Sequence, residues 1–225
     1  MTPAARRGDA GLSGASDLDA AVASIRAELD AANAARERAL PLCRSATRHA
    51  ANCIRAVHRR EIEEAETLLG ESGRAVAAAS EALARFPAVF HAGFVHDAQK
   101  EYAEASITLA LIAHRPLPRQ ADLGVEGPAY LHGLAESIGE LRRYLLDSLR
   151  AGTDSAVEEC ERTLQHMDDI YSLLVTVDYP DALTASLRRV TDVARGILER
   201  TRGDLTLTVQ QDRLARRLDR LQPGS

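Results

Sequence analysis

The chain has 225 residues, enough for one large domain or two small ones. Apolar residues make up 45% of it and charged residues 27%, a balance that excludes disorder as the default interpretation. The net charge of −5 at pH 7 argues against a protein that coats duplex DNA through a broad basic surface, although it leaves room for a local basic groove.

Cysteine spacing and hydropathy indicate a cytoplasmic protein. Cys43, Cys53 and Cys160 show no CxxC spacing, so reduced thiols are expected rather than a disulfide framework or a zinc site. No uncharged apolar run approaches the roughly 18 residues of a membrane span, and no membrane partner is expected. Residues 1–16 are polar and lack the apolar core of a signal peptide, so we expect a disordered lead-in.

Ala and Leu supply most of the apolar content, which favours helices over strands. Pro41 is expected to interrupt the first helix, Gly70 to close the second, and Thr153 or Asp154 to cap the sixth. Helices are predicted, in chain order, at about residues 17–40, 42–69, 72–85, 87–113, 128–152, 154–177 and 183–203. The longest loop is predicted at 114–127, and 207–221 is a candidate for a short terminal helix.

The predicted fold class is therefore all-α, with seven long helices in an extended bundle. No segment shows the period-2 pattern of a strand. The predicted helical domain covers 17–206, followed by a tail at 207–225. An apolar stripe at Phe86, Phe90 and Phe94 is expected to pack in the core.

Acidic residues recur at helical spacing on two of the predicted helices. Glu101 and Glu104 are three residues apart, and Asp97 extends the same row by one turn. Glu136 and Glu140, four apart, repeat the pattern on the next helix. Two carboxylate pairs on neighbouring helices would suit a hard cation such as Mg²⁺ or Mn²⁺. Such pairs are also common on solvated helix faces, so an exposed acidic face without a metal remains the alternative.

A glycine lies inside the second acidic segment. Gly139 occupies a helix interior, where it costs about 1 kcal/mol relative to Ala. We therefore expect a backbone or a ligand to approach closely at this position.

Basic residues form a second row. Arg44, Arg48, Arg55 and Arg59 fall within about 60° of one another on a helix, opposite a side of small apolar residues, and Arg60 flanks them. Such a row is suited to tracking a phosphate backbone. Pairing with acids such as Glu61 and Glu64 on a solvated face is the alternative.

Taken together, these segments resemble the translin family. Residues 41–48 (PLCRSATR) and 54–60 (IRAVHRR) are similar to its basic second helix. Residues 100–105 (KEYAEA) resemble the QEYVEA motif of translin-associated factor X, and 130–143 (YLHGLAESIGELRR) resemble its YLLGxADLTGELxR motif. Residues 193–206 (VARGILERTRGDLT) look like the end of prokaryotic members, and the similarity covers about residues 30–208.

The resemblance implies a seven-helix fold that assembles into closed oligomers and binds single-stranded RNA or DNA. A homo-oligomer of about six to eight subunits is expected. It also implies Mg- or Mn-dependent RNA cleavage through the carboxylates of Glu101, Glu104 and Glu136, with Glu140 at the neighbouring acid of the motif. The residues expected to contact nucleic acid are Arg44, Arg48, Arg55, Arg59, Arg60, His96 and Lys100.

One departure from the factor X motif concerns turnover. Glu136 stands where factor X has Asp, which moves the carboxylate by about 1.5 Å, and a misplacement near 1 Å can cost about 10²-fold in rate. A non-catalytic oligomer that binds single-stranded RNA or DNA is therefore the main alternative. A structural bundle whose acidic and basic rows pair between subunits is another.

Overall fold

The computed structural model describes residues 11–151 and 156–221, and this part of the chain forms nine helices and no strand. The predicted all-α class is confirmed. Six of the helices are long, and α3, α5 and α8 are single turns. The bounds are α1 Gly11–His58, α2 Ile62–Leu83, α3 Pro87–Phe90, α4 Gly93–Ile112, α5 Gln120–Leu123, α6 Gly127–Ala151, α7 Ala156–Leu174, α8 Asp181–Thr184 and α9 Leu187–Leu221.

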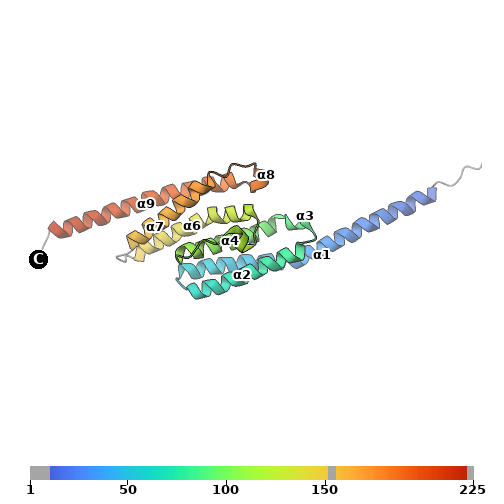
Figure 1. Cartoon of the computed structure of the whole chain (residues 1–225), viewed down its shortest axis with the longest axis horizontal. Helices are drawn as coiled ribbons and strands as arrows, with labels where there is room; N and C mark the ends of the chain where they lie inside the picture. Colours follow the sequence, from blue (N-terminus) through green and yellow to red (C-terminus); the bar gives the residue numbers. More distant parts are fainter. Residues whose placement is uncertain (1–10, 152–155, 222–225) are drawn as a thin grey trace, which may run out of the picture.

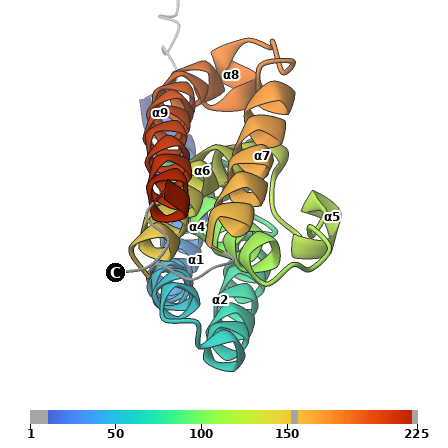
Figure 2. The same ribbon diagram turned by 90° about the vertical axis from the view of Figure 1, so that its left-hand side faces the viewer.

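The long helices form two groups that meet at a central seam (Figures 1 and 2). In the first group α1 packs against α2 and α4, and in the second α6 packs against α7 and α9. The contact between α4 and α6 joins them. Because the two acidic motifs lie on α4 and α6, this seam brings them together.

The prediction that Pro41 interrupts a helix is wrong, because α1 runs through it from Gly11 to His58. An interior proline costs about 3 kcal/mol by removing one hydrogen bond and crowding the preceding turn. Pro41 itself is exposed, while Ala39 and Cys43 beside it are buried in the core. Packing on both sides of the proline therefore keeps the helix continuous.

The first turn of the bundle lies at residues 59–61 instead, and Gly70 is inside α2 rather than at its end. Arg60 adopts a left-handed conformation, with φ of 63°. Its backbone N–H donates to the Val57 carbonyl at 2.9 Å, and that of Glu61 donates to the Ala56 carbonyl at 2.9 Å. These two bonds form a Schellman motif, in which an arginine takes the place usually held by glycine.

Three further boundaries differ from the predictions. The helix expected at 87–113 is divided into α3 and α4, and the loop expected at 114–127 contains α5. The last helix does not end at Gly203 but continues to Leu221, so residues 207–221 belong to α9. The predicted cap at Thr153 or Asp154 lies outside the described residues.

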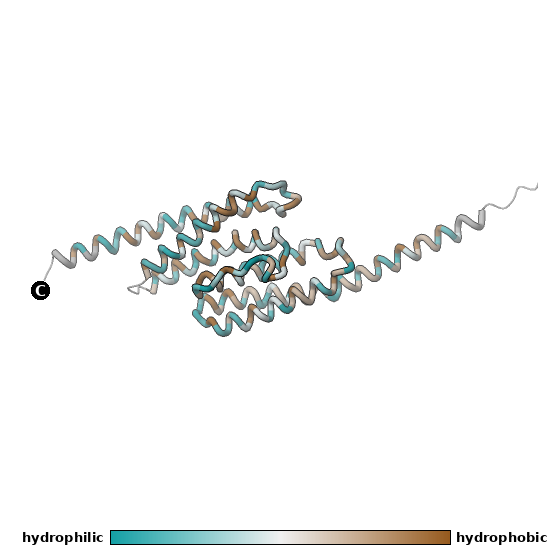
Figure 3. Tube along the Cα trace, in the orientation of Figure 1, coloured by the Kyte–Doolittle hydropathy of each residue, from teal (hydrophilic) through white to brown (hydrophobic). Residues whose placement is uncertain are grey.

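The core follows the helix pairs. Phe86, Phe90 and Phe94 pack, partly buried, against the buried cluster between α1, α2 and α4, as predicted. By contrast, the first half of α1 projects beyond the bundle, and its hydrophobic residues lie singly among hydrophilic ones (Figures 1 and 3). Within residues 11–151 and 156–221, no helix combines the length and hydropathy that a membrane span requires.

Candidate metal and nucleic-acid site

Gly133 is what allows the two acidic helices to approach each other. A Cβ at this position would stand 2.8 Å from both the Cβ of Ala103 and the backbone nitrogen of Glu104. Real Cβ atoms do not approach other atoms so closely, so only glycine fits where α6 crosses α4. At Gly139 the expected approach of a backbone is not observed within the described chain, because a Cβ there would have only the Ile197 side chain at 4.0 Å.

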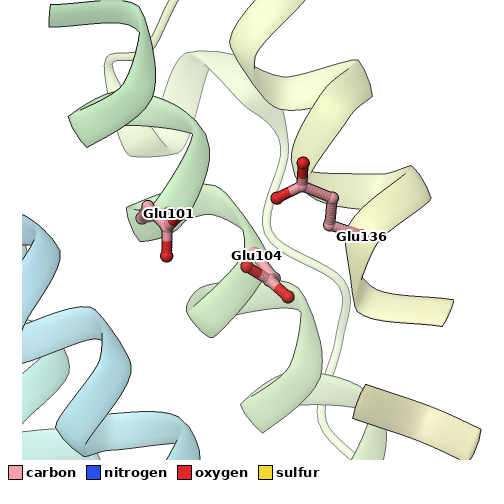
Figure 4. A group of neighbouring side chains, drawn as sticks. All are labelled: Glu101, Glu104 and Glu136. Carbon is pink, nitrogen blue, oxygen red and sulfur yellow. The ribbon is translucent and has the colours of Figure 1, made fainter. Parts of the chain in front are cut away.

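Three carboxylates meet at this crossing. Glu136 reaches from α6 toward α4, which carries Glu101 and Glu104 (Figure 4). One oxygen from each of the three lies within 4.8 Å of the others. The predicted meeting of acids from the two helices is thus observed for Glu101, Glu104 and Glu136, whereas Glu140 lies outside the group. A donor set made only of carboxylate oxygens suits hard cations such as Mg²⁺ and Mn²⁺.

Glu104 is the buried member of this cluster, with only 8% of its surface exposed. Within the described part of the chain it makes no hydrogen bond or ion pair. Burial raises the pKa of its carboxyl group to about 8, and the negative charges of Glu136 and Glu101 add to the rise. An ionised carboxylate that is buried without a partner is costly, so Glu104 is either protonated or balanced by a cation.

Lys100 is the cation nearest the cluster. Its Nζ lies 2.8 Å and 3.1 Å from the two carboxylate oxygens of Glu136 and 3.3 Å from Glu101 Oε1. Burial alone would lower the pKa of Lys100, but its bonds to these two carboxylates raise the pKa overall. The lysine thus balances two of the three acids and leaves Glu104 without a direct partner.

Glu140 lies outside the cluster and contacts His58, a histidine beside the arginine row that was not among the predicted site residues. His58 Nε2 lies 2.5 Å from Glu140 Oε2, and the imidazole is 5% exposed. This hydrogen bond lowers the pKa of Glu140, although burial opposes it. Glu140 is therefore a neighbour of the three-carboxylate group and not a fourth member of it.

An open groove of about 700 Å³ runs between α1 and α4 to the edge of the acidic cluster. It is lined by Arg44 and Arg48 from α1 and by Lys100 and Glu101 from α4. Both arginines are exposed, and within residues 11–151 and 156–221 neither has an ion pair or a hydrogen-bonding partner. Two free guanidinium groups beside the carboxylates are therefore available to an anion.

The remaining arginines of the predicted row do not line this groove. Arg55 donates to Asn52 at 2.5 Å, and Arg59 pairs with Glu61 at 2.5 Å and with Glu64 at 3.6 Å. For Arg59, the alternative of pairing with nearby acids is the one observed. The Arg60 guanidinium lies 5.5 Å above the Tyr144 ring, in a different pocket.

His96 also faces away from the groove. It lines a pocket of about 460 Å³ with His91 and Gln99, and its ring meets that of His132 edge to face at 5.2 Å. Burial and the neighbouring His132 lower the pKa of His96. The lowered pKa favours the neutral imidazole at neutral pH.

Comparison with known proteins relates the whole bundle to one family. No family model matches the chain. It is 33% identical over 191 residues to the uncharacterized protein MJ0175 of Methanocaldococcus jannaschii, covering 84% of this chain and 83% of that protein. The structure of AfC3PO superposes with a TM-score of 0.77 at 32% identity, covering 84% of this chain and 97% of AfC3PO.

AfC3PO has also been solved in complex with duplex RNA. The apo form of NeC3PO, at 18% identity, shares the fold with a TM-score of 0.73 over 83% of this chain and 96% of that one. These similarities extend over the helices that carry both acidic motifs, and they agree with the resemblance seen in the sequence. The chain therefore belongs to the translin family, in its prokaryotic branch.

Proposed function

We propose that the protein is a divalent-metal-dependent endoribonuclease that binds RNA in the groove between α1 and α4. The observation that carries this proposal is the meeting of Glu101, Glu104 and Glu136 within 4.8 Å at the end of a groove lined by unpaired arginines. The duplex RNA bound by AfC3PO, at 32% identity, supports RNA as the ligand.

In this mechanism the three carboxylates would hold Mg²⁺ or Mn²⁺, and Glu104 would give up its proton to do so. A bound divalent cation would orient a water molecule and neutralise charge on the scissile phosphate. Arg44 and Arg48 would hold phosphates of the same strand along the groove, each through a bidentate contact. Glu140, kept ionised by His58, would add negative charge beside the cation.

A binding protein without catalysis is the second candidate. It is favoured by Lys100, whose ammonium group already forms ion pairs with the carboxylates of Glu136 and Glu101 without any metal. Labelled RNA incubated with and without Mg²⁺ or Mn²⁺ separates the two candidates. Cleavage only with metal supports the nuclease, and intact RNA with every divalent metal leaves the binding protein.

The two groove arginines are expected to carry RNA binding. Replacing Arg44 and Arg48 together with Ala should weaken binding of a single-stranded oligoribonucleotide. It should also flatten the slope of log K against log salt by about 1.4, because each lost contact removes about 0.7. The matched control is Arg55→Ala with Arg59→Ala, which removes the same charge from side chains that already have partners. Filter binding at several salt concentrations measures the affinity and the salt slope. Equal losses of affinity in the two double variants would contradict the proposal that RNA binds in this groove.

We also propose that the protein is a homo-oligomer of about six to eight subunits. Leu18, Val22, Ile25 and Leu29 are exposed on the projecting half of α1 at steps of 4, 3 and 4, the spacing of a coiled-coil seam. Light scattering should therefore give six to eight times the 24.3 kDa of one chain. Leu29→Glu should lower that mass, whereas Leu173→Glu, at an equally exposed leucine on α7, should not. A monomeric wild type would contradict this proposal.

Metal binding is expected to release close to one proton per subunit at pH 7. The pKa of Glu104 is about 8 without metal, so this carboxyl is mostly protonated at pH 7 and must ionise to bind a cation. Calorimetric titration with Mn²⁺ in two buffers of different ionisation enthalpy measures the release. At pH 9 the carboxyl is already ionised, so the release should fall nearly to zero. The same heat in both buffers at pH 7 would exclude Glu104 as a ligand.

A further inference from the structure

Lys100 occupies the position from which a divalent cation would bind Glu136. It is the only lysine in the sequence, and its side chain is 17% exposed. Its Nζ contacts both oxygens of Glu136 and one of Glu101. A divalent cation needs oxygens of these same two carboxylates. The ammonium and the metal therefore compete for them, and metal entry requires Lys100 to leave.

The Lys100 side chain can also reach the groove between α1 and α4. The same residue lines both the acidic cluster and the groove that contains Arg44 and Arg48. A lysine carries its charge on a flexible four-carbon chain, so its ammonium group can turn from one site to the other without a change in the helix. The groove is lined by two exposed arginines as well as by Asp97 and Glu101, so a phosphate of bound RNA would supply further negative charge for the ammonium group on that side.

We propose that Lys100 is an exchangeable internal counter-ion, held by Glu136 and Glu101 without metal and transferred to an RNA phosphate when a divalent cation binds. This inference rests on the proposed metal site and names its regulation. RNA draws the ammonium group away from the carboxylates, so RNA binding strengthens metal binding. By thermodynamic reciprocity, the metal strengthens RNA binding by the same factor. The site would thus fill with metal mainly when a substrate is in the groove.

Lys100→Gln separates the charge of this residue from its size. Glutamine keeps a hydrogen-bonding side chain of similar length and is also the residue in the factor X motif that this segment resembles. Without RNA, the variant should bind Mn²⁺ about tenfold more tightly than the wild type, within the usual range of coupling between sites. The matched control is Arg59→Gln, which removes one positive charge from an exposed arginine of α1 that pairs with Glu61 and does not line the groove. Its Mn²⁺ affinity without RNA should equal that of the wild type.

The experiment is a Mn²⁺ titration of the full-length proteins, followed by the electron paramagnetic resonance signal of free Mn²⁺. Each protein is titrated alone and with a saturating 2′-O-methyl oligoribonucleotide, and gel electrophoresis after the titration checks that the oligonucleotide is intact. In the wild type the oligonucleotide should tighten Mn²⁺ binding several-fold, and in Lys100→Gln it should add much less.

Two results would overturn the inference and leave the metal site intact. The first is equal Mn²⁺ affinity of the wild type and Lys100→Gln without RNA. The second is an equal gain from the oligonucleotide in both proteins. Failure of the wild type to bind Mn²⁺ in either condition would instead remove the proposed metal site, and the inference with it.

Discussion

Glu101→Gln is expected to reduce Mg²⁺- or Mn²⁺-dependent RNA cleavage by at least about 100-fold, since loss of even an outer-shell partner costs 10- to 100-fold. The substitution keeps the size of the side chain and removes the charge that would hold the cation. Binding of single-stranded RNA should persist, because Arg44 and Arg48 are unchanged and one nearby negative charge is gone.

The matched control for this variant is Asp97→Asn, one turn earlier on α4. Asp97 is exposed, lines the same groove and lies outside the three-carboxylate cluster. Its neutralisation should leave cleavage within a few-fold of the wild type, as measured by initial rates on a labelled oligoribonucleotide. If both variants cut RNA at the wild-type rate, the carboxylates at the seam are not the catalytic site.

The second large effect is expected at the helix crossing. Gly133→Ala should destabilise the protein by about 1–3 kcal/mol, because its Cβ would overlap the Ala103 Cβ and the Glu104 backbone and push α6 away from α4. The same displacement separates Glu136 from Glu101 and Glu104. Since about 1 Å of misplacement can cost about 10²-fold in rate, cleavage should fall even where the variant is fully folded.

Gly139→Ala is the control, six residues later on the same helix. Its Cβ would make only an ordinary contact with Ile197 at 4.0 Å, so the gain in helix propensity should stabilise the protein by about 0.5–1 kcal/mol. Urea unfolding of the two variants measures the difference in the free energy of unfolding. A Gly133→Ala protein as stable as Gly139→Ala would show that the helices do not depend on this close approach.

These two glycines show where sequence reasoning is strong and where it fails. Helical spacing alone places Glu101 and Glu104 on one face, and the likeness of two segments to family motifs pairs them with Glu136. Which interior glycine lies against the backbone of a neighbouring helix cannot be read from its local sequence, since Gly133 and Gly139 both lie in the α6 interior. The choice depends on how α6 is rotated against α4, and the core fixes that rotation.

The predictions of helix boundaries were wrong for a related reason. Pro41 is the residue that should end a helix, yet burial of Ala39 and Cys43 on its two sides outweighs the local cost. The actual turn is made by Arg60 in a left-handed conformation, which arginine does not favour and which no sequence pattern marks. In both places tertiary packing overrides local preference.

Contacts between residues that are far apart in the sequence also could not be predicted from residue spacing. His58 and Glu140 are 82 residues apart in the sequence, and only the packing of α1 near α6 brings them within 2.5 Å. Likewise, the row of four arginines is regular in the sequence, but nearby partners at Asn52 and Glu61 occupy Arg55 and Arg59. Arg44 and Arg48 are thereby distinguished as the pair open to a ligand.

A crystal of the protein soaked in Mn²⁺ tests the central claim most directly, because manganese is located by its anomalous scattering. We expect one peak between Glu101, Glu104 and Glu136, with Lys100 Nζ no longer in contact with Glu136. The absence of a peak at saturating Mn²⁺, with Lys100 still bonded to both Glu136 and Glu101, would contradict a metal site at the α4–α6 seam.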